Sequence, residues 1–265
     1  MSVPLILAAR SRGALPVFDL DELAPYGVDA FITGRTGGVS APPYDELNLA
    51  LHVGDDPRCV GENRRRVAVA AAVDPAHLVT SNQTHGATVN DLDHWRGEPL
   101  DGDALVTTRD DVAMCVMVAD CVPLVFVEPT GRRLAVAHAG WRGLAAGIIP
   151  ATLAHFAAPR DVRVVMGPHI SGASYQIGPE VARYFEDIEG ACLDDVGDRR
   201  RLDLAVVTRH QLHREGVDDL HVASCALDTD GGTVFFSDRA QRPSGRFGLV
   251  ARRRTYDSSL REGTP

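Results

Sequence analysis

The sequence predicts a mixed α/β fold of the α+β kind, a single domain whose β-sheets are flanked by helices. Short apolar runs alternate with segments of helical spacing along all 265 residues, and no repeat or linker interrupts them. The runs at 116–118 and 122–127 lack the polar alternation of a half-exposed strand. We therefore expect central strands that are buried on both faces, and one domain that spans residues 1–265.

The N-terminal part predicts two strands, a long loop and a helix. Residues 14–32 have the pattern of a strand, a turn and a second strand that ends at Thr33. Residues 34–56 show little periodicity, and a loop of this length inside a compact domain usually has a function. A helix is predicted over residues 57–73, because Asp56 can cap it and Pro57 suits its first turn.

The segment 115–143 organises the rest of the chain. It predicts two apolar strands joined by a polar turn at residues 128–133, with Cys121 on the first strand and His138 at the end of the second. Strands are also predicted over 81–89, which carries His85, and over 104–107. A helix over 141–156 begins just after His138. Further strands are expected at 162–167, 220–223, 233–236 and 246–252, and helices at 179–187 and 203–215.

Charge and cysteine usage exclude several classes of protein. The net charge of -9 and the pI near 5.5 argue against nucleic acid as a partner, since its binders usually carry a basic face. The apolar runs are shorter than a membrane span, and the N-terminus lacks the basic start of a signal peptide. Five cysteines without a CxxC pair indicate free thiols rather than a disulfide framework. We expect a cytoplasmic protein without a membrane partner.

Three residues stand out as a candidate catalytic centre: His85, Cys121 and His138. Each is expected at a strand end, next to glycine or proline. One cysteine and two histidines form a three-ligand zinc set with an open fourth position, the arrangement of catalytic zinc. The same atoms could instead form a metal-free thiol–imidazole pair. Their wide separation in sequence matches no compact metal motif, so packing as ordinary core residues is the third interpretation.

Ordered motifs then suggest a family. QTHG, GDALVT, ADCVP, HAGWRG, GPHI followed by YQIG, and FFS with SGR together resemble the YfiH-like family. That family also carries the label of a multicopper polyphenol oxidase or laccase domain, and is taken as a family of purine nucleoside phosphorylases. The resemblance runs from TGRTGGVS near Thr33 to Arg246, nearly the whole chain. It implies a layered fold of mixed sheets and helices, like that of YfiH and CNF1.

The resemblance also implies a chemistry. His85, Cys121 and His138 would be zinc ligands and the catalytic centre of a cytoplasmic enzyme. The implied reactions are phosphorolysis of adenosine, inosine, guanosine and methylthioadenosine, and deamination of adenosine. Purine nucleosides and phosphate would be its partners, and the sequence does not indicate an oligomeric state. The family's usual YEVG and FSYRR are changed here at Gln176 and at Asp238, which bears on the choice of substrate.

Other residues are candidates for contacting the substrate. Arg142 suits phosphate, because a guanidinium binds anion oxygens in pairs and a predicted helix starts beside it. Arg64 is a second candidate for the anion. Asn48 and Gln83 could bind base or ribose edges. Asp120, next to Cys121, is a candidate proton carrier for deamination, which needs one.

Two rival functions use the same residues. In a metal-free hydrolase acting on an amide, Cys121 would be the nucleophile and His138 or His85 the base; editing of peptidoglycan precursors belongs to this class. In a copper polyphenol oxidase the thiolate would suit copper. The oxidase is disfavoured, because a laccase needs a further copper cluster, commonly built from His-x-His pairs, and the chain contains no such pair.

Overall fold

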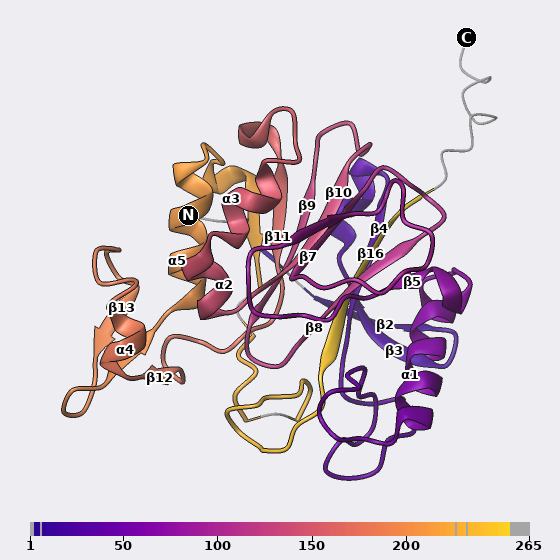
Figure 1. The fold of residues 1–265 in the computed structure, drawn as a ribbon, viewed down its shortest axis with the longest axis horizontal. Helices are drawn as coiled ribbons and strands as arrows, with labels where there is room; N and C mark the ends of the chain where they lie inside the picture. The colour runs from indigo at the N-terminus through magenta and orange to yellow at the C-terminus, as the bar shows by residue number, and fades with distance from the viewer. Residues whose placement is uncertain (1–2, 6, 226, 232, 255–265) are drawn as a thin grey trace.

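The computed structural model describes residues 3–5, 7–225, 227–231 and 233–254. Its elements form four layers (Figure 1). Helix α1 (Pro57–Ala70) covers a six-stranded sheet, which packs on a seven-stranded sheet. Helices α2 (Trp141–Ala146), α3 (Ile148–Leu153) and α5 (Leu204–Arg214) cover the far face of the second sheet. The predicted fold class, mixed sheets flanked by helices, is confirmed.

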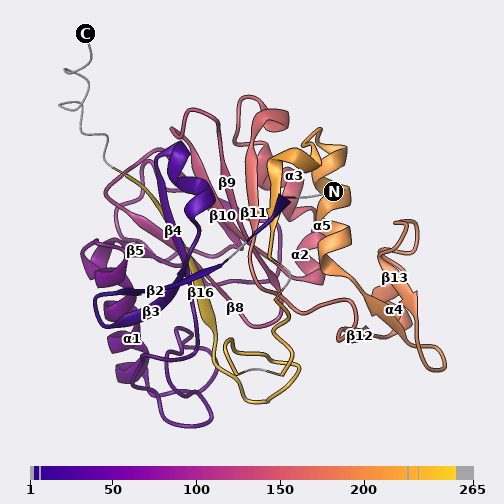
Figure 2. The ribbon, with the colours of Figure 1, turned by 180° about the vertical axis from the view of Figure 1, so that it is seen from behind.

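Both large sheets are mixed. The six-stranded sheet lies toward the viewer in Figure 2, and its only parallel pairing among the described strands joins its last two. In order it contains β2 (Ala8–Arg12), β3 (Leu15–Asp19), β4 (Val28–Thr33), β16 (Phe247–Arg253), β8 (Ala113–Val118) and β5 (Leu78–Val79). The seven-stranded sheet contains β1 (Val3–Pro4), β15 (Val222–Ser224), β11 (Arg163–Met166), β9 (Val122–Val127), β10 (Leu134–Ala139), β7 (Ala104–Thr107) and β6 (Val89–Asp91).

A small third sheet projects beside α5 (Figure 1). It contains β12 (Gln176–Ile177), β14 (Arg200–Leu202) and β13 (Cys192–Asp194), and the short helix α4 (Pro179–Ala182) packs against it. Four 3₁₀ turns complete the chain: η1 (Asp21–Tyr26), η2 (Pro75–His77), η3 (Pro159–Asp161) and η4 (Asp219–His221).

The central strands are buried on both faces, as their continuous apolar sequences predict. Every residue of β8, β9 and β10 is buried. Along β8, Met114, Val116 and Val118 face the core between the two large sheets, whereas Cys115 and Met117 face α1. Because successive side chains point to opposite faces, a strand between two apolar layers must be apolar at every position.

The expected first central strand is in fact two strands in different sheets. Strand β8 ends at Val118, and β9 begins at Val122 in the other sheet. Between them Asp120 has a φ of 87°, a left-handed conformation that an L residue adopts only at a cost and that no extended strand contains. Cys121 therefore lies in the crossing between the two sheets rather than on a strand.

The strand expected at residues 81–89 is also wrong. His85 lies in a loop between β5 and β6, with a φ of 58°. The backbone N–H groups of residues 84–86 donate to the carboxylate of Asp103 instead of to a neighbouring strand. The Asp103 side chain thus accepts the backbone hydrogen bonds that a neighbouring strand would have accepted.

Several helix boundaries differ from expectation. The helix over 141–156 is split into α2 and α3 at Gly147, whose φ of 88° ends the first segment. The helices expected over 57–73 and 179–187 end at Ala70 and Ala182. Residues 233–236, expected as a strand, lie outside any strand. The single domain over 1–265 stays a prediction, because both ends of the chain include residues outside the described ranges.

Candidate metal centre and pocket

Three side chains from separate parts of the chain meet beside the end of the seven-stranded sheet. One ligand atom from each of His85, Cys121 and His138 lies within 4.8 Å of the other two. The two imidazole rings are 4.7 Å apart between centroids and meet edge to face at 84°. The structure therefore brings together the three residues that the sequence nominated.

The pairing of β9 with β10 positions the thiol. Ala139 pairs with Val122, so the next residues outward, Gly140 and Cys121, lie side by side. A Cβ on Gly140 would lie 2.8 Å from the Cys121 Sγ and 3.3 Å from the His85 ring. The φ of Gly140 is -82°, which any residue tolerates, so glycine is needed here for space and not for backbone conformation.

One buried carboxylate organises both histidines. Oδ1 of Asp103 accepts from the His85 backbone N–H at 2.9 Å and lies 2.8 Å from Nδ1 of His138. Its Oδ2 accepts from the N–H groups of Thr84 and Gly86 and from the Thr84 hydroxyl. With a proton on Nδ1, the Nε2 atom of His138 keeps a lone pair that can bind a metal ion together with Cys121 and His85.

The charges of the site are coupled. Burial opposes ionisation of Cys121, but the charge and hydrogen bonds of His138 and His85 lower the pKa of its thiol to about 6. Burial likewise opposes the charged form of His138, but Cys121 and Asp103 raise the pKa of its imidazole to about 9. Burial disfavours the Asp103 carboxylate, yet the hydrogen bonds from His138 and the Gly86 N–H hold its pKa below the ordinary value. Both pKa shifts favour an ion pair of the Cys121 thiolate with a protonated His138 in the absence of a bound cation.

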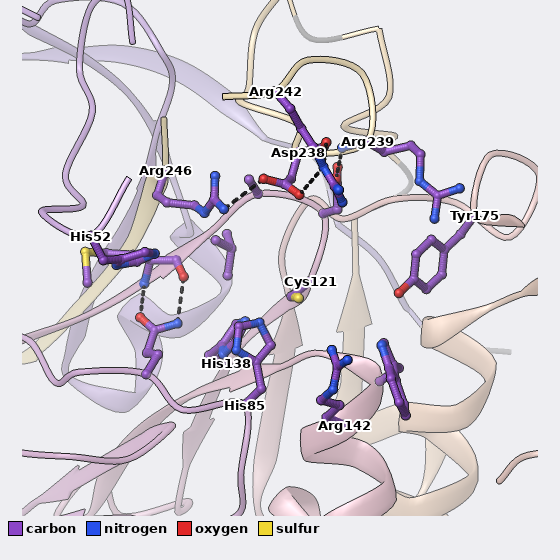
Figure 3. Close-up of a pocket in the computed structure, with 16 residues that line it drawn as sticks. His52, His85, Cys121, His138, Arg142, Tyr175, Asp238, Arg239, Arg242 and Arg246 are labelled. Atoms are coloured by element: carbon purple, nitrogen blue, oxygen red, sulfur yellow. Dashed lines mark hydrogen bonds and ion pairs between the residues drawn. The ribbon is translucent and has the colours of Figure 1, made fainter. Parts of the chain in front are cut away.

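A pocket opens over the three donors, and its wall gathers four arginines (Figure 3). Asp238 forms ion pairs of 2.9 Å with both Arg242 and Arg246. The guanidinium of Arg142 lies 4.3 Å from the Trp141 ring centroid, on the opposite side of the opening. The remaining wall residues include His52, Gln83, Met117, Asp120, Tyr175 and Arg239.

The predicted substrate residues have different positions. Arg142 and Gln83 line the pocket, but Gln83 bonds the backbone N–H and C=O of Met117 with both ends of its amide. Asn48 is fully buried, and its amide bonds Ala50 and other internal groups. The guanidinium of Arg64 donates to the Leu49 carbonyl, the Thr80 hydroxyl and the Met117 sulfur. Substrate contact by Gln83, Asn48 and Arg64 stays a prediction, which these internal bonds do not favour.

Asp120 holds the pocket wall together. Its Oδ1 accepts from the Thr229 hydroxyl at 2.7 Å, and its Oδ2 accepts from the Arg239 backbone N–H at 2.7 Å. Both oxygens therefore hold Thr229 and Arg239 next to the crossing that carries Cys121. This arrangement favours a positioning role over the proton-carrier role that the sequence suggested.

Sequence reasoning missed four residues of the site: Asp103, Tyr175, Arg239 and Arg246. Each one belongs to a motif that was singled out, namely GDALVT, YQIG, the segment after FFS, and SGR. The motifs marked the right segments. No local spacing rule assigns a role to residues such as Asp103 and Arg239, which bond groups 18 and 119 positions away.

The donor set fits a metal ion. One thiolate and two imidazoles can supply the three protein ligands of a catalytic zinc site, whose fourth position is left for water or substrate. The same donors can bind copper. The carboxylate behind His138 is the usual partner of a metal-binding histidine. In the described part of the chain this is the one group of three or more such donors close enough to share an ion. None of the described helices is both long and apolar enough to span a membrane.

Comparison with known families gives a match across most of the chain. The sequence profile of the family described as "Multi-copper polyphenol oxidoreductase laccase" matches residues 29–254. A purine nucleoside phosphorylase of Pseudomonas aeruginosa is 38% identical over 230 residues, which cover 84% of this chain and 93% of the relative. The purine nucleoside phosphorylase YfiH of Escherichia coli K12 is 37% identical over 229 residues, which cover 84% of this chain and 92% of that protein.

Solved structures share the fold. YlmD from Geobacillus stearothermophilus has a TM-score of 0.86 at 32% identity, and the alignment covers 95% of this chain and 100% of YlmD. A YfiH protein of Bacillus licheniformis has a TM-score of 0.85 at 29% identity, with 92% of this chain and 98% of that protein covered. The fold described above is therefore that of the YfiH proteins.

Proposed function

The chain belongs to the multi-copper polyphenol oxidoreductase laccase family, which includes the YfiH proteins, and on this premise we propose that it is a zinc-dependent purine nucleoside phosphorylase that also deaminates adenosine. The proposed substrates are adenosine, inosine, guanosine and methylthioadenosine, with phosphate as the second substrate. The names of the similar proteins support phosphorolysis. We further propose that the enzyme acts in the cytoplasm.

The single observation that carries the proposal is the open face of the three-donor group. His85, Cys121 and His138 converge within 4.8 Å, and all three line a pocket that also contains Arg142. A structural zinc site is closed by four protein ligands, whereas a catalytic one keeps a position free. When bound, zinc would supply Lewis acidity and lower the pKa of a coordinated water.

Phosphorolysis needs an anion next to the ribose. The bond from C1′ to the purine nitrogen breaks with its electron pair going to the base, and a phosphate oxygen forms the new bond to C1′. The base then takes up a proton. The role of the chain is to bind and orient the two substrates, and the Arg142 guanidinium supplies paired donors for phosphate oxygens. Deamination exchanges the 6-amino group of adenosine for oxygen from water and releases ammonia.

The test combines metal content with two product assays. We expect about one equivalent of zinc in the purified protein and release of hypoxanthine from inosine that depends on phosphate. The Cys121→Ala variant should lose both phosphorolysis and deamination while its circular dichroism stays unchanged. Full activity of that variant on either substrate would refute a shared centre for the two reactions.

A second function is favoured by one specific observation. Nδ1 of His138 lies 2.8 Å from Asp103, and the same imidazole reaches Cys121, so the three residues have the order of a Cys–His–Asp triad. This geometry suits a metal-free thiol hydrolase acting on an amide, such as a peptidoglycan precursor. Iodoacetamide inactivation through Cys121, with amide turnover that survives chelation, would favour the hydrolase over the phosphorylase.

The copper oxidase suggested by the family label is the weakest candidate. A multicopper oxidase needs a cluster of several histidines besides a mononuclear site. The described residues contain a single three-donor group, and the whole sequence contains no His-x-His pair. Copper could occupy the His85, Cys121 and His138 donors, but a second cluster has no ligands within the ranges described.

A further inference from the structure

Tyr175 presents to the pocket a hydroxyl that has no hydrogen-bond partner among the described residues. The residue lines the pocket and is partly buried, and no described group forms a hydrogen bond with its hydroxyl. In Figure 3 the hydroxyl points toward the space between Cys121 and Arg142. A phenol inside a pocket normally finds a hydrogen-bond partner, so a ligand group is the natural occupant of this space.

The position of this hydroxyl is fixed by its surroundings. The Tyr175 backbone bonds Ser171 and Leu202 at 3.0 Å each. The guanidinium of Arg239 covers the Tyr175 ring at 5.0 Å from its centroid, and it is held by a 2.9 Å bond to the Gln176 carbonyl. A donor that is already oriented loses little entropy when a ligand binds.

Of the four arginines that line the pocket, Arg142 is the best placed to bind an anion. Arg242 and Arg246 are both ion-paired with Asp238, and Arg239 donates to a carbonyl. Arg142 has no hydrogen bond or ion pair with any described residue, and its only ring contact is the stack on Trp141. Asp238 on the opposite wall already pairs with Arg242 and Arg246 and competes with an anion for them, whereas no described carboxylate pairs with Arg142.

We propose that the Tyr175 hydroxyl and the Arg142 guanidinium together form the binding subsite for inorganic phosphate. Arg142 donates to two phosphate oxygens and Tyr175 to a third, beside the three-donor group. Burial raises the pKa of the Tyr175 phenol to about 12, so the group stays a donor throughout the neutral range. This inference rests on the proposed phosphorolysis and adds the residue that completes its anion site.

The experiment compares three variants of the zinc-loaded protein. Tyr175→Phe keeps the ring under Arg239 and removes only the hydroxyl, and Arg142→Gln removes the charge. Tyr184→Phe is the matched control, because Tyr184 is exposed, is not among the residues that line the pocket, and has a hydroxyl that accepts from Arg183 instead. Phosphate binding is followed by isothermal titration calorimetry, and the KM values for phosphate and inosine and the kcat are measured separately.

We expect Tyr175→Phe to raise the phosphate Kd and KM about tenfold or more, as for one lost hydrogen bond to a charged group. The KM for inosine should change less than twofold, and Arg142→Gln should have a larger effect of the same kind. Tyr184→Phe should match the wild type. An unchanged phosphate KM in Tyr175→Phe, or equal losses for phosphate and inosine, would overturn the subsite.

The binding assay separates this inference from the proposed function. If the wild type binds phosphate through Tyr175 and Arg142 but does not cleave nucleosides, the subsite stands and phosphorolysis fails. If the wild type cleaves inosine with phosphate while both variants bind phosphate normally, phosphorolysis stands and the subsite fails.

Discussion

Replacing Asp103 with asparagine should weaken metal binding by changing the proton position on His138. The Oδ2 site of Asp103 accepts three donors, from the Thr84 N–H, the Thr84 hydroxyl and the Gly86 N–H. The Oδ1 site accepts from the His85 N–H and faces His138 Nδ1. An asparagine will therefore put its oxygen at the three-donor site and its NH₂ group toward His138. That NH₂ needs an acceptor, which favours the tautomer of His138 with its proton on Nε2, where a metal ion would have to bind.

The size of the effect follows from these contacts. Loss of the carboxylate behind a metal-binding histidine usually costs roughly 10- to 100-fold in metal affinity. The His85 N–H also loses its acceptor in a partly buried loop, which should lower the free energy of unfolding by about 1–3 kcal/mol. The two costs appear in different measurements, the first in zinc affinity and the second in the stability of the metal-free protein.

The assay is a zinc competition against a chromophoric chelator, together with thermal unfolding of the metal-free protein and ¹⁵N NMR of the histidine rings. Asp101→Asn is the matched control, because Asp101 is exposed and, within the described ranges, its carboxylate accepts only from the Asn82 side chain. If Asp103→Asn unfolds at a lower temperature but binds zinc as tightly as the control, the carboxylate stabilises the loop and does not orient the ligand.

Three further predictions follow from the same geometry. Gly140→Ala should reduce zinc affinity at least tenfold, because the new Cβ would lie 2.8 Å from the Cys121 sulfur. Gly61→Ala is the control, because a Cβ at that position has no atom within 4 Å, and equal zinc affinities of the two variants would contradict the packing argument. Arg142→Ala should weaken the phosphate dependence of phosphorolysis more than it weakens deamination, and equal losses in the two product assays would remove the anion assignment. In chelator-treated protein, alkylation of Cys121, followed by peptide mass spectrometry, should rise with pH around a midpoint near 6, because its thiol pKa is lowered to about 6; a midpoint near 9 would show that His138 does not stabilise the thiolate.

The buried strands were predictable because burial on two faces leaves a continuous apolar sequence. The run from Val122 to Val127 has no polar residue to mark a solvent face, and all six residues are buried. The same property made β8 and β9 look like one strand, because both are equally apolar. The turn between them depends on Asp120, a left-handed residue that is not glycine and therefore gives no turn signal. The apolar composition of a strand indicates that it is buried, but it does not indicate which sheet the strand belongs to.

The three donor residues of the candidate site could be predicted from the sequence, whereas the residues that position them could not. Motifs located His85, Cys121 and His138, but the local pattern put His85 on a strand. Its loop exists because the Asp103 carboxylate, 18 residues further along, takes the backbone hydrogen bonds that a strand would have used. Such a bond is a property of the folded chain. The break between α2 and α3, by contrast, could have been predicted from Gly147, since a glycine inside a predicted helix weakens the helix.

The charge balance of the centre connects its metal and its thiol chemistry. The Cys121 thiolate is partly buried and the Asp103 carboxylate is fully buried, and two negative charges withdrawn from water need compensation. Without a cation, a proton held by His138 balances only one of them. A divalent ion balances both and leaves the two imidazoles neutral, as ligands must be. On charge alone the donors suit a divalent ion better than a monovalent copper ion, and the ion pair of Cys121 with His138 is the arrangement expected of the same residues without a cation.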